Sequence, residues 1–387
     1  MKSRALRWLY VYSFLDDFIL IYPLYQLMFV AHGLSVAQIS WLFVIWSAVS
    51  IVVEVPTGVL ADRFSRKNLL AVGQVIRAAG YGMWLLVPNF WGYAAGFVLW
   101  GIGGALHSGT YEALVFDELK LVGQEKQYVR VNGRLASVFL VGQLIAVTLA
   151  AAAIGLGYNG VLVLSIATVL VTAVVAYNIP EAPRQEETAD TGYFAELAEG
   201  VREAVKNPAV LRIIMLSGFI VAIFGSLEEY TPIFFQAAGA SLQTVPLLEA
   251  ALVLVTATAS ALAHRVEHLG TRLFMLLLAV AGVCLLASEG GHGAGGIVLV
   301  VAFFGLMKLL EVIFDGQLQH SIKGRMRATI TSVAGFGAEL LSIGIYLAFG
   351  AVAETRGTFA AFGVFGAVTV LVAVAYLVVG RRVFAVR

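Results

Sequence analysis

Acidic and basic side chains recur inside long apolar runs of this sequence. Burying such a group in a membrane costs a few kcal/mol or more unless it faces a partner or water, so each one is a candidate for binding or proton transfer. The candidates are Asp16, Asp17, Glu54, Arg77, Glu112, Asp117, Glu228, Glu229, Glu249, Lys308, Glu311, Asp315 and Glu339.

The adjacent acids Asp16 and Asp17 are the strongest candidates for proton chemistry. Neighbouring helical residues point about 100° apart, so one carboxyl group can face a cavity while the other packs against a helix. Two nearby carboxylates in a low-dielectric site do not easily ionise together, so one of them is predicted to hold an exchangeable proton. The alternative is an acidic pair at a helix end that reaches water. Glu228 and Glu229 form a similar pair, for which coupling and a structural contact both stay open, and Tyr22 is a candidate substrate contact.

A second group of charges lies on one stripe of a later apolar run. Lys308, Glu311 and Asp315 are spaced i, i+3 and i+7, so they share one face of a helix. This spacing predicts an ion pair that lowers the cost of burial. The functional alternative is that Lys308 releases its carboxylate partner when substrate or a proton binds, with Glu339 as a second partner.

The composition is that of an integral membrane protein. Of 387 residues, 60% are hydrophobic and 13% charged, with a mean hydropathy of +0.89. A soluble domain has roughly a quarter charged residues. The single cysteine, Cys284, excludes a disulfide within the chain and a cysteine-based metal site. The sequence has no Gly-x4-Gly-Lys-Ser/Thr loop and no nucleophile–base set, so we predict no ATP-driven transport, no enzyme activity, no metal and no cofactor.

Twelve apolar runs are each long enough to span a bilayer. They lie at about 6–30, 39–61, 69–88, 90–117, 132–156, 158–179, 209–237, 244–263, 271–288, 296–320, 328–352 and 358–379. The first run has no cleavage site after it, so we expect a span rather than a removed signal. Of the 25 basic residues, 22 lie in the termini and in alternate connections. The positive-inside rule therefore places both termini in the cytoplasm.

The runs divide into two halves that resemble each other. We predict a six-helix bundle over 1–180, a cytoplasmic linker with an amphipathic helix over 181–208, and a second six-helix bundle over 209–387. Residues 111–119 and 310–318 end corresponding runs with similar patterns of acids, and 134–138 and 327–333 begin corresponding runs with Arg. This repetition is typical of transporters built from duplicated units.

The charged turn between the second and third runs identifies a family. Gly58-x-Leu60-Ala61-Asp62-Arg63-x-Ser65-Arg66-Lys67 resembles the signature loop of the major facilitator superfamily of transporters. Ser65 departs from the pattern, because the family usually has Gly there. The resemblance implies twelve helices in two pseudo-symmetric bundles, with helices 1, 4, 7 and 10 lining a central cavity.

The resemblance also implies two groups of site residues. The first, in the cavity, serves proton coupling or substrate binding and comprises Asp16, Asp17, Tyr22, Glu228, Glu229, Lys308, Glu311, Asp315 and Glu339. The second is a cytoplasmic gate, in which Asp62, Arg66 and Asp117 form a latch. The gate group comprises Glu54, Gly58, Asp62, Arg63, Arg66, Lys67, Arg77, Glu112 and Asp117.

These observations predict a monomeric secondary active transporter of the cell membrane, working by alternating access. Its expected partners are a small-molecule substrate, protons and the lipid bilayer, with the proton gradient as driving force and no nucleic acid. An acidic cavity favours a cationic or zwitterionic organic solute, and the resemblance implies export, because many family members with this loop are drug or metabolite exporters. The first alternative is proton-driven uptake of a small polar metabolite, because the fourth run lacks the Arg, and the fifth the Gly-Pro pair, usual in drug–proton antiporters of the family. The second is a non-transporting receptor or scaffold on the same fold.

Overall fold

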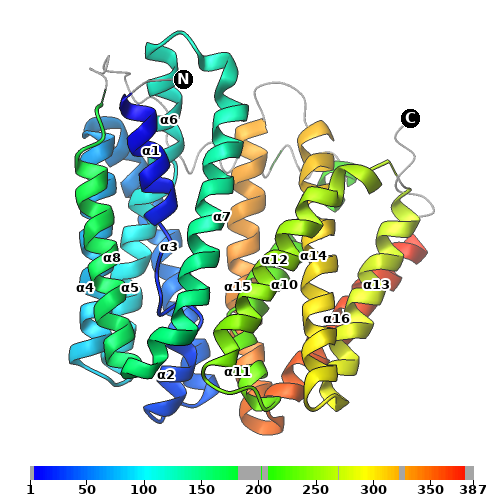
Figure 1. Ribbon diagram of the computed structural model, residues 1–387. Coiled ribbons are helices and arrows are strands. Elements are labelled where there is room, and N and C mark those ends of the chain that lie inside the picture. The colour runs from blue at the N-terminus through cyan, green and yellow to red at the C-terminus, as the bar shows by residue number, and fades with distance from the viewer. Residues whose placement is uncertain (1–3, 182–201, 203–207, 269, 322–326, 380–387) are drawn as a thin grey trace. The chain divides into compact units, whose positions relative to one another are not determined.

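The computed structural model describes residues 4–181, 202, 208–268, 270–321 and 327–379, where all regular secondary structure is helical (Figure 1). Nine helical segments within these residues are long and apolar enough to cross a membrane. The all-α membrane class predicted from composition is therefore confirmed. The predicted runs are not all recovered as single long helices, because several of them are interrupted.

The described residues form two compact units. The first unit is made of Met1–Leu34, Leu42–Asp190 and Leu242–Ala250, and the second of Ser35–Trp41, Thr191–Ser241 and Ala251–Arg387. The predicted boundaries at 180 and 208 stay a prediction, because nearly all of the linker and its amphipathic helix lie outside the described residues.

Helices of the first half of the chain supply most of the first unit. They are α1 (Arg4–Leu15), α2 (Tyr25–Ala31), α3 (Val36–Arg63), α4 (Arg66–Leu86), α5 (Phe90–His107), α6 (Thr110–Leu121), α7 (Tyr128–Ala153) and α8 (Gly157–Tyr177), with short 3₁₀ turns at Glu125–Gln127 and Ile154–Leu156. Helix α4 packs against both α5 and α8, and α1 packs against α7 and α8.

Helices of the second half supply most of the second unit. They are α10 (Pro208–Glu228), α11 (Thr231–Ala237), α12 (Thr244–Val266), α13 (Thr271–Ala287), α14 (Ala294–Ser321), α15 (Arg327–Arg356) and α16 (Thr358–Val379), with a 3₁₀ turn at Ser288–Gly290. Helix α13 packs against α16 and α14, and α10 packs against α15 and α14.

Three predicted continuous helices are interrupted in the structure. The run over 6–30 stops after Leu15 and resumes at Tyr25, the run over 90–117 breaks before Thr110, and the run over 209–237 breaks after Glu228. Two of the breaks have a local cause: Gly109 adopts φ +69° at the start of α6, and Pro232 lies in the first turn of α11, where its missing N–H costs nothing. In the first run, Pro23 disfavours helix for the residue before it, but α1 already ends at Leu15.

Glycines bring α4 and α5 into close contact. A Cβ on Gly103 would lie 2.8 Å from the main-chain oxygen of Gly73, and a Cβ on Gly80 would lie 2.9 Å from that of Gly96. Small residues at membrane helix contacts allow backbones to approach in this way. Arg77 lies four residues after Gly73 and three before Gly80, on the same side of α4. This packing therefore directs Arg77 along the α4–α5 contact.

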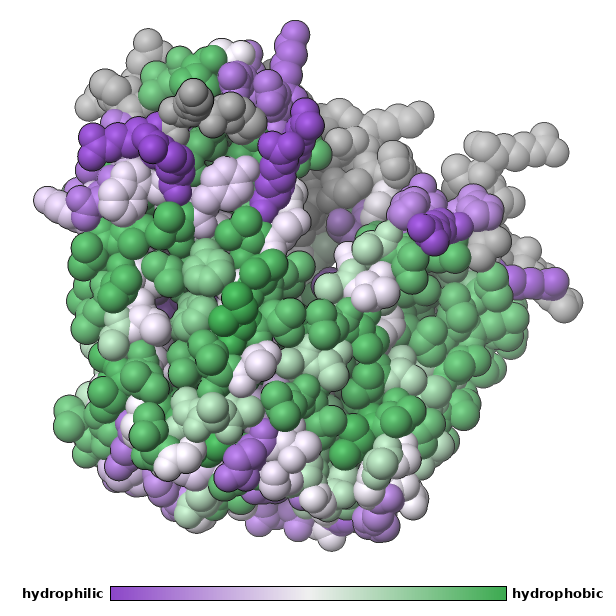
Figure 2. Space-filling model, viewed as in Figure 1, coloured by the Kyte–Doolittle hydropathy of each residue, from purple (hydrophilic) through white to green (hydrophobic). Residues whose placement is uncertain are grey.

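The visible face of the molecule in Figure 2 is largely apolar. Hydrophobic residues cover its middle, and hydrophilic ones gather toward its upper and lower ends. Val52, Leu86 and Leu371 are each more than two-thirds exposed, as expected for side chains that face lipid in a membrane protein.

Candidate functional site

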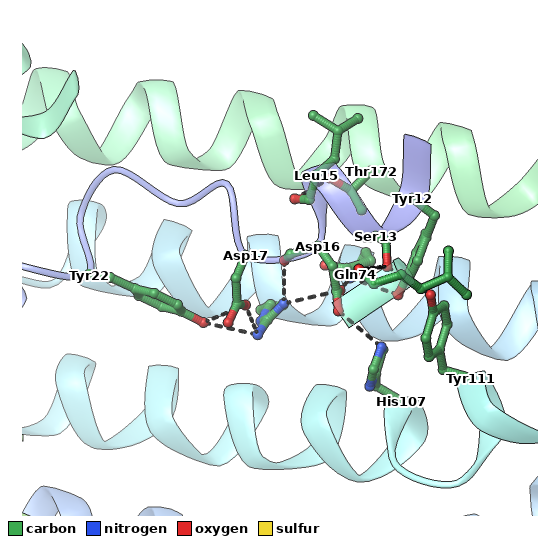
Figure 3. A network of polar contacts seen from close by, with 12 residues as sticks. Tyr12, Ser13, Leu15, Asp16, Asp17, Tyr22, Gln74, His107, Tyr111 and Thr172 are labelled. Carbon is green, nitrogen blue, oxygen red and sulfur yellow. Dashed lines mark hydrogen bonds and ion pairs between the residues drawn. The ribbon is translucent and has the colours of Figure 1, made fainter. Parts of the chain in front are cut away.

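The candidate site of the first unit lies where α1 ends. Asp16 and Asp17 directly follow the last residue of that helix, and the chain then runs without helical structure as far as Leu24 (Figure 3). Asp16 is buried, at 8% exposure, and Asp17 is half-buried. The carboxyl end of a helix carries a negative partial charge, so two carboxylates there require positive partners.

Arg77 of α4 is the main partner of this pair. Its Nη2 donates to Asp17 Oδ1 at 2.9 Å and to the Tyr22 hydroxyl at 2.9 Å, and its Nη1 donates to the main-chain oxygen of Asp16 at 3.0 Å. The Tyr22 hydroxyl in turn donates to Asp17 Oδ1 at 3.2 Å. These contacts join Arg77 to the end of α1. Its predicted role with Glu54 at the cytoplasmic gate stays a prediction.

Asp16 has a different set of partners. Gln74 Nε2 donates to Asp16 Oδ1 at 2.7 Å and to the Tyr12 hydroxyl at 3.1 Å. His107 Nε2, at the last residue of α5, lies 3.0 Å from Asp16 Oδ2. Arg77 Nη1 is farther away, at 3.8 Å from Asp16 Oδ1. Each carboxylate therefore has its own basic neighbour: Arg77 for Asp17 and His107 for Asp16.

Aromatic rings fix the orientation of His107. Its ring stacks on Tyr111, with centroids 5.4 Å apart, and lies nearly parallel to Tyr12 at 6.1 Å. Tyr111 is held in turn by a hydrogen bond of 2.8 Å between its hydroxyl and Ser13 Oγ. A histidine in an apolar run is more often a packing or capping group than a site residue, so the sequence did not reveal His107 as a site residue. Its contact with Asp16 makes it part of the acid–base cluster.

A cavity adjoins this cluster. Its volume is about 210 Å³, and its polar lining comes from Asp16, Asp17, Gln74, Arg77 and His107, with Phe139 of α7 on the apolar side. A water molecule occupies roughly 30 Å³ in the liquid, so the cavity has room for several. The acids and His107 can thus exchange protons with water inside the first unit.

The second unit also contains charged side chains within its helices. Lys308 Nζ donates to Glu311 Oε1 at 2.8 Å, and the ammonium group lies 5.2 Å from the ring centroid of Phe224 on α10. The structure thus contains the i, i+3 ion pair expected on α14. Glu228 is the last residue of α10 and Glu229 follows it, both half-buried.

Two other predicted cavity residues lie at exposed positions. Asp315 on α14 and Glu339 on α15 are both exposed, whereas Lys308 and Glu311 are half-buried. The stripe over 308, 311 and 315 therefore changes from half-buried to exposed along α14. Binding roles for Asp315 and Glu339 stay predictions.

Among its described residues, the predicted gate contains the expected contact between Arg66 and Asp117. It also contains a carboxylate, Glu181, that the sequence did not reveal. Arg66 Nη1 pairs with Asp117 Oδ2 of α6. Glu181 accepts hydrogen bonds from the Ser65 hydroxyl and, at 2.6 Å, from the Arg66 main-chain N–H. Ser65 caps α4, accepting from the main-chain N–H of Asn68. An acid at a helix N-terminus is favourable, but nothing in the spacing connects position 181 to position 65.

The other predicted gate residues have different surroundings. The Lys67 ammonium lies 5.4 Å from the ring centroid of Tyr177, while Glu54, Arg63 and Glu112 are exposed. The surroundings of Gly58 and the side chain of Asp62 lie outside what the structure describes. The latch therefore stays a prediction for Asp62, while the contact between Arg66 and Asp117 is present.

Comparison with known proteins identifies the family. A family model described as Major Facilitator Superfamily matches residues 8–345. A comparison with curated protein sequences finds no match. A solved structure of the nucleoside transporter NupG, in a mutant form, is similar with a TM-score of 0.81 at 15% identity, covering 97% of this chain and 99% of that one.

Two other solved structures share the fold. A bacterial homolog to the human lysosomal transporter Spinster has a TM-score of 0.74 at 18% identity, covering 98% of this chain and 96% of that one. A D-xylose–proton symporter has a TM-score of 0.69 at 15% identity, with 95% of each chain covered. The family model covers most of the sequence and the fold agrees, so this chain belongs to the major facilitator superfamily of membrane transporters.

Proposed function

We propose that this chain is a proton-coupled secondary transporter that works by alternating access and exports a cationic or zwitterionic small organic molecule. Membership of the family makes it a membrane transporter rather than an enzyme. The coupling ion, the substrate class and the direction are the proposal. One observation carries it: two carboxylates, an arginine and a histidine meet at a helix interruption beside a cavity of about 210 Å³.

The cluster has the chemistry that proton coupling needs. Buried acids in membrane transporters are typical of proton relays. Here Asp16 and Asp17 are close enough to influence each other, and both line a cavity that water can enter. One half of a transport cycle can therefore load a proton, and the other half can release it.

The charges also favour a cation over an anion. Arg77 donates to Asp17, to Tyr22 and to the main chain of Asp16, so three of its five N–H groups are engaged and an anionic substrate has to compete with these partners. Lys308 is likewise engaged by Glu311. A positive or zwitterionic solute can instead compete for the carboxylates. One of the structural neighbours is a D-xylose–proton symporter, which supports proton coupling on this fold.

The test uses the full chain in proteoliposomes with a pH-sensitive dye inside. Organic cations, zwitterions and anions are added one at a time to wild type, Asp16→Asn and Asp17→Asn, with Glu354→Gln as a control for an exposed acid on α15. We expect a cation or zwitterion to move protons in wild type and in the control, and at least one Asp variant to abolish this movement. The sign of the pH change distinguishes export by exchange from uptake with protons. Solute transport without proton movement refutes the coupling, and transport limited to anions refutes the substrate class.

A further inference from the structure

The cluster at the end of α1 contains four ionisable groups whose charges do not balance unless one proton is added. Asp16 and Asp17 contribute two negative charges and Arg77 one positive charge. His107 is neutral or positive, depending on its proton. With His107 neutral the cluster has one uncompensated negative charge, and with His107 protonated it is neutral. Buried charges are expected to be paired, so this cluster has a place for one proton.

The distances show where that proton belongs. Arg77 Nη2 lies 2.9 Å from Asp17 Oδ1, but Arg77 Nη1 lies 3.8 Å from Asp16 Oδ1. His107 Nε2 lies 3.0 Å from Asp16 Oδ2. Asp17 is therefore neutralised by a permanent cation, whereas Asp16 is next to a group that gains and loses charge.

Among the described residues, no other group near His107 replaces this role. The titratable or charged groups near it are Asp16 and Asp17 from the end of α1, Tyr12 from α1, Arg77 from α4, and Tyr111 and Glu112 from α6. The tyrosines are hydrogen-bonded to Gln74 and Ser13, and Glu112 is exposed. From α7, the cavity receives the apolar Phe139.

His107 also has the access that a proton carrier needs. Its side chain is 30% exposed, against 12% for that of Asp16, and both line the cavity. His107 is the last residue of α5, immediately before the break at Ser108 and Gly109. A change in the attraction between His107 and Asp16 therefore acts on a point where the helix is already interrupted.

We infer that the exchangeable proton is held between His107 and Asp16, one per transport cycle, and that Arg77 and Asp17 form a fixed ion pair. In the loaded state a proton from water makes His107 an imidazolium ion against the Asp16 carboxylate. In the unloaded state the proton has returned to water, and a neutral imidazole faces that carboxylate. This inference rests on the proposed proton coupling and names the residues and the stoichiometry for it.

The first experiment measures stoichiometry and coupling in proteoliposomes with the membrane potential clamped at zero. One coupled proton supports about tenfold accumulation of substrate per pH unit of gradient, and two support about a hundredfold. We expect the tenfold slope in wild type and in His32→Gln, a control histidine on the loop after α2. In His107→Gln we expect no accumulation, while exchange of labelled for unlabelled substrate continues and shows that the protein is folded. A hundredfold slope, or retained accumulation in His107→Gln, overturns the inference.

The second experiment detects the pair without transport. In full-length protein with isotope-labelled histidine in lipid nanodiscs, we expect the imidazole signal of His107 to titrate over a pH range that Asp16→Asn shifts and that Glu354→Gln, at the exposed acid on α15, leaves in place. If Asp16→Asn leaves that range unchanged, the pairing is overturned. If the pairing is observed but wild type moves solute without protons, the proposed function fails while the proton site stands.

Discussion

Removal of Arg77 tests whether the ion pair with Asp17 supports the first unit. Arg77→Met keeps an unbranched apolar stem of similar reach, but it deletes the guanidinium that donates to Asp17, Tyr22 and the main-chain oxygen of Asp16. Asp17 is then left at the negative end of α1 without its cation.

The expected magnitude follows from the burial of the pair. The side chains of Arg77 and Asp17 are 15% and 20% exposed, so water compensates only a small part of the loss. Breaking a buried ion pair by removing one partner costs about 3–5 kcal/mol. We expect a loss in this range for Arg77→Met, and recovery of about 2 kcal/mol or more when Asp17→Asn is added, because the uncompensated charge is then gone.

The assay is the free energy of unfolding from reversible denaturation in mixed detergent micelles. The two single variants and the double variant complete a mutant cycle, and Arg63→Met is the control because Arg63 is an exposed arginine at the last residue of α3. A loss below about 1 kcal/mol for Arg77→Met, which is the level of a surface ion pair, refutes the assigned burial. A double variant no more stable than Arg77→Met refutes the pairing with Asp17.

Two further predictions concern packing and the second unit. Gly103→Ala places a Cβ 2.8 Å from a main-chain oxygen of α4, so we expect a loss of about 1–3 kcal/mol in the same assay, whereas Gly104→Ala, with open space around it, is expected to be neutral. Equal stability of the two variants refutes the close helix contact. Lys308→Met leaves the half-buried Glu311 without its cation, so we expect a lower thermal unfolding midpoint that Glu311→Gln restores in the double variant. If Glu311→Gln does not restore the unfolding midpoint, Lys308 does not stabilise the protein through its ion pair with Glu311.

The sequence predicts the acids of the site better than their partners. Asp16 and Asp17 are visible because charged residues in an apolar run are rare and costly. Arg77 is visible for the same reason, but its partner depends on which face of α4 packs against which helix. That face is set by contacts of Gly73 and Gly80 with α5. Such contacts join segments that are far apart in sequence, and no periodicity within one run reveals them.

The helix interruptions were also only partly predictable. Pro23 is a visible breaker, but it restricts mainly the residue before it, whereas the helical structure of α1 already ends at Leu15. Hydropathy continues through the break, because Phe18, Ile19 and Leu20 are as apolar as the helix itself. Apolar length therefore predicts that a segment crosses the membrane, but it does not predict that the segment stays helical throughout.

The two interruptions at the first helix of each half place acids in the same way. Asp16 and Asp17 follow α1, while Glu228 ends α10 and Glu229 follows it. Carboxylates are unfavourable at the carboxyl end of a helix, so each pair needs a cation from a neighbouring helix.

In the first unit the cation is Arg77 of α4, and the second unit has a lysine, Lys308 of α14, that pairs with Glu311. A helix break leaves main-chain carbonyl groups without helical partners, and the acid pair adds negative charge beside them. Both make a neighbouring positive charge favourable at that point. Gain or loss of a single proton at such a point changes the attraction between two helices. This is how a local protonation can bias the arrangement of a helix bundle.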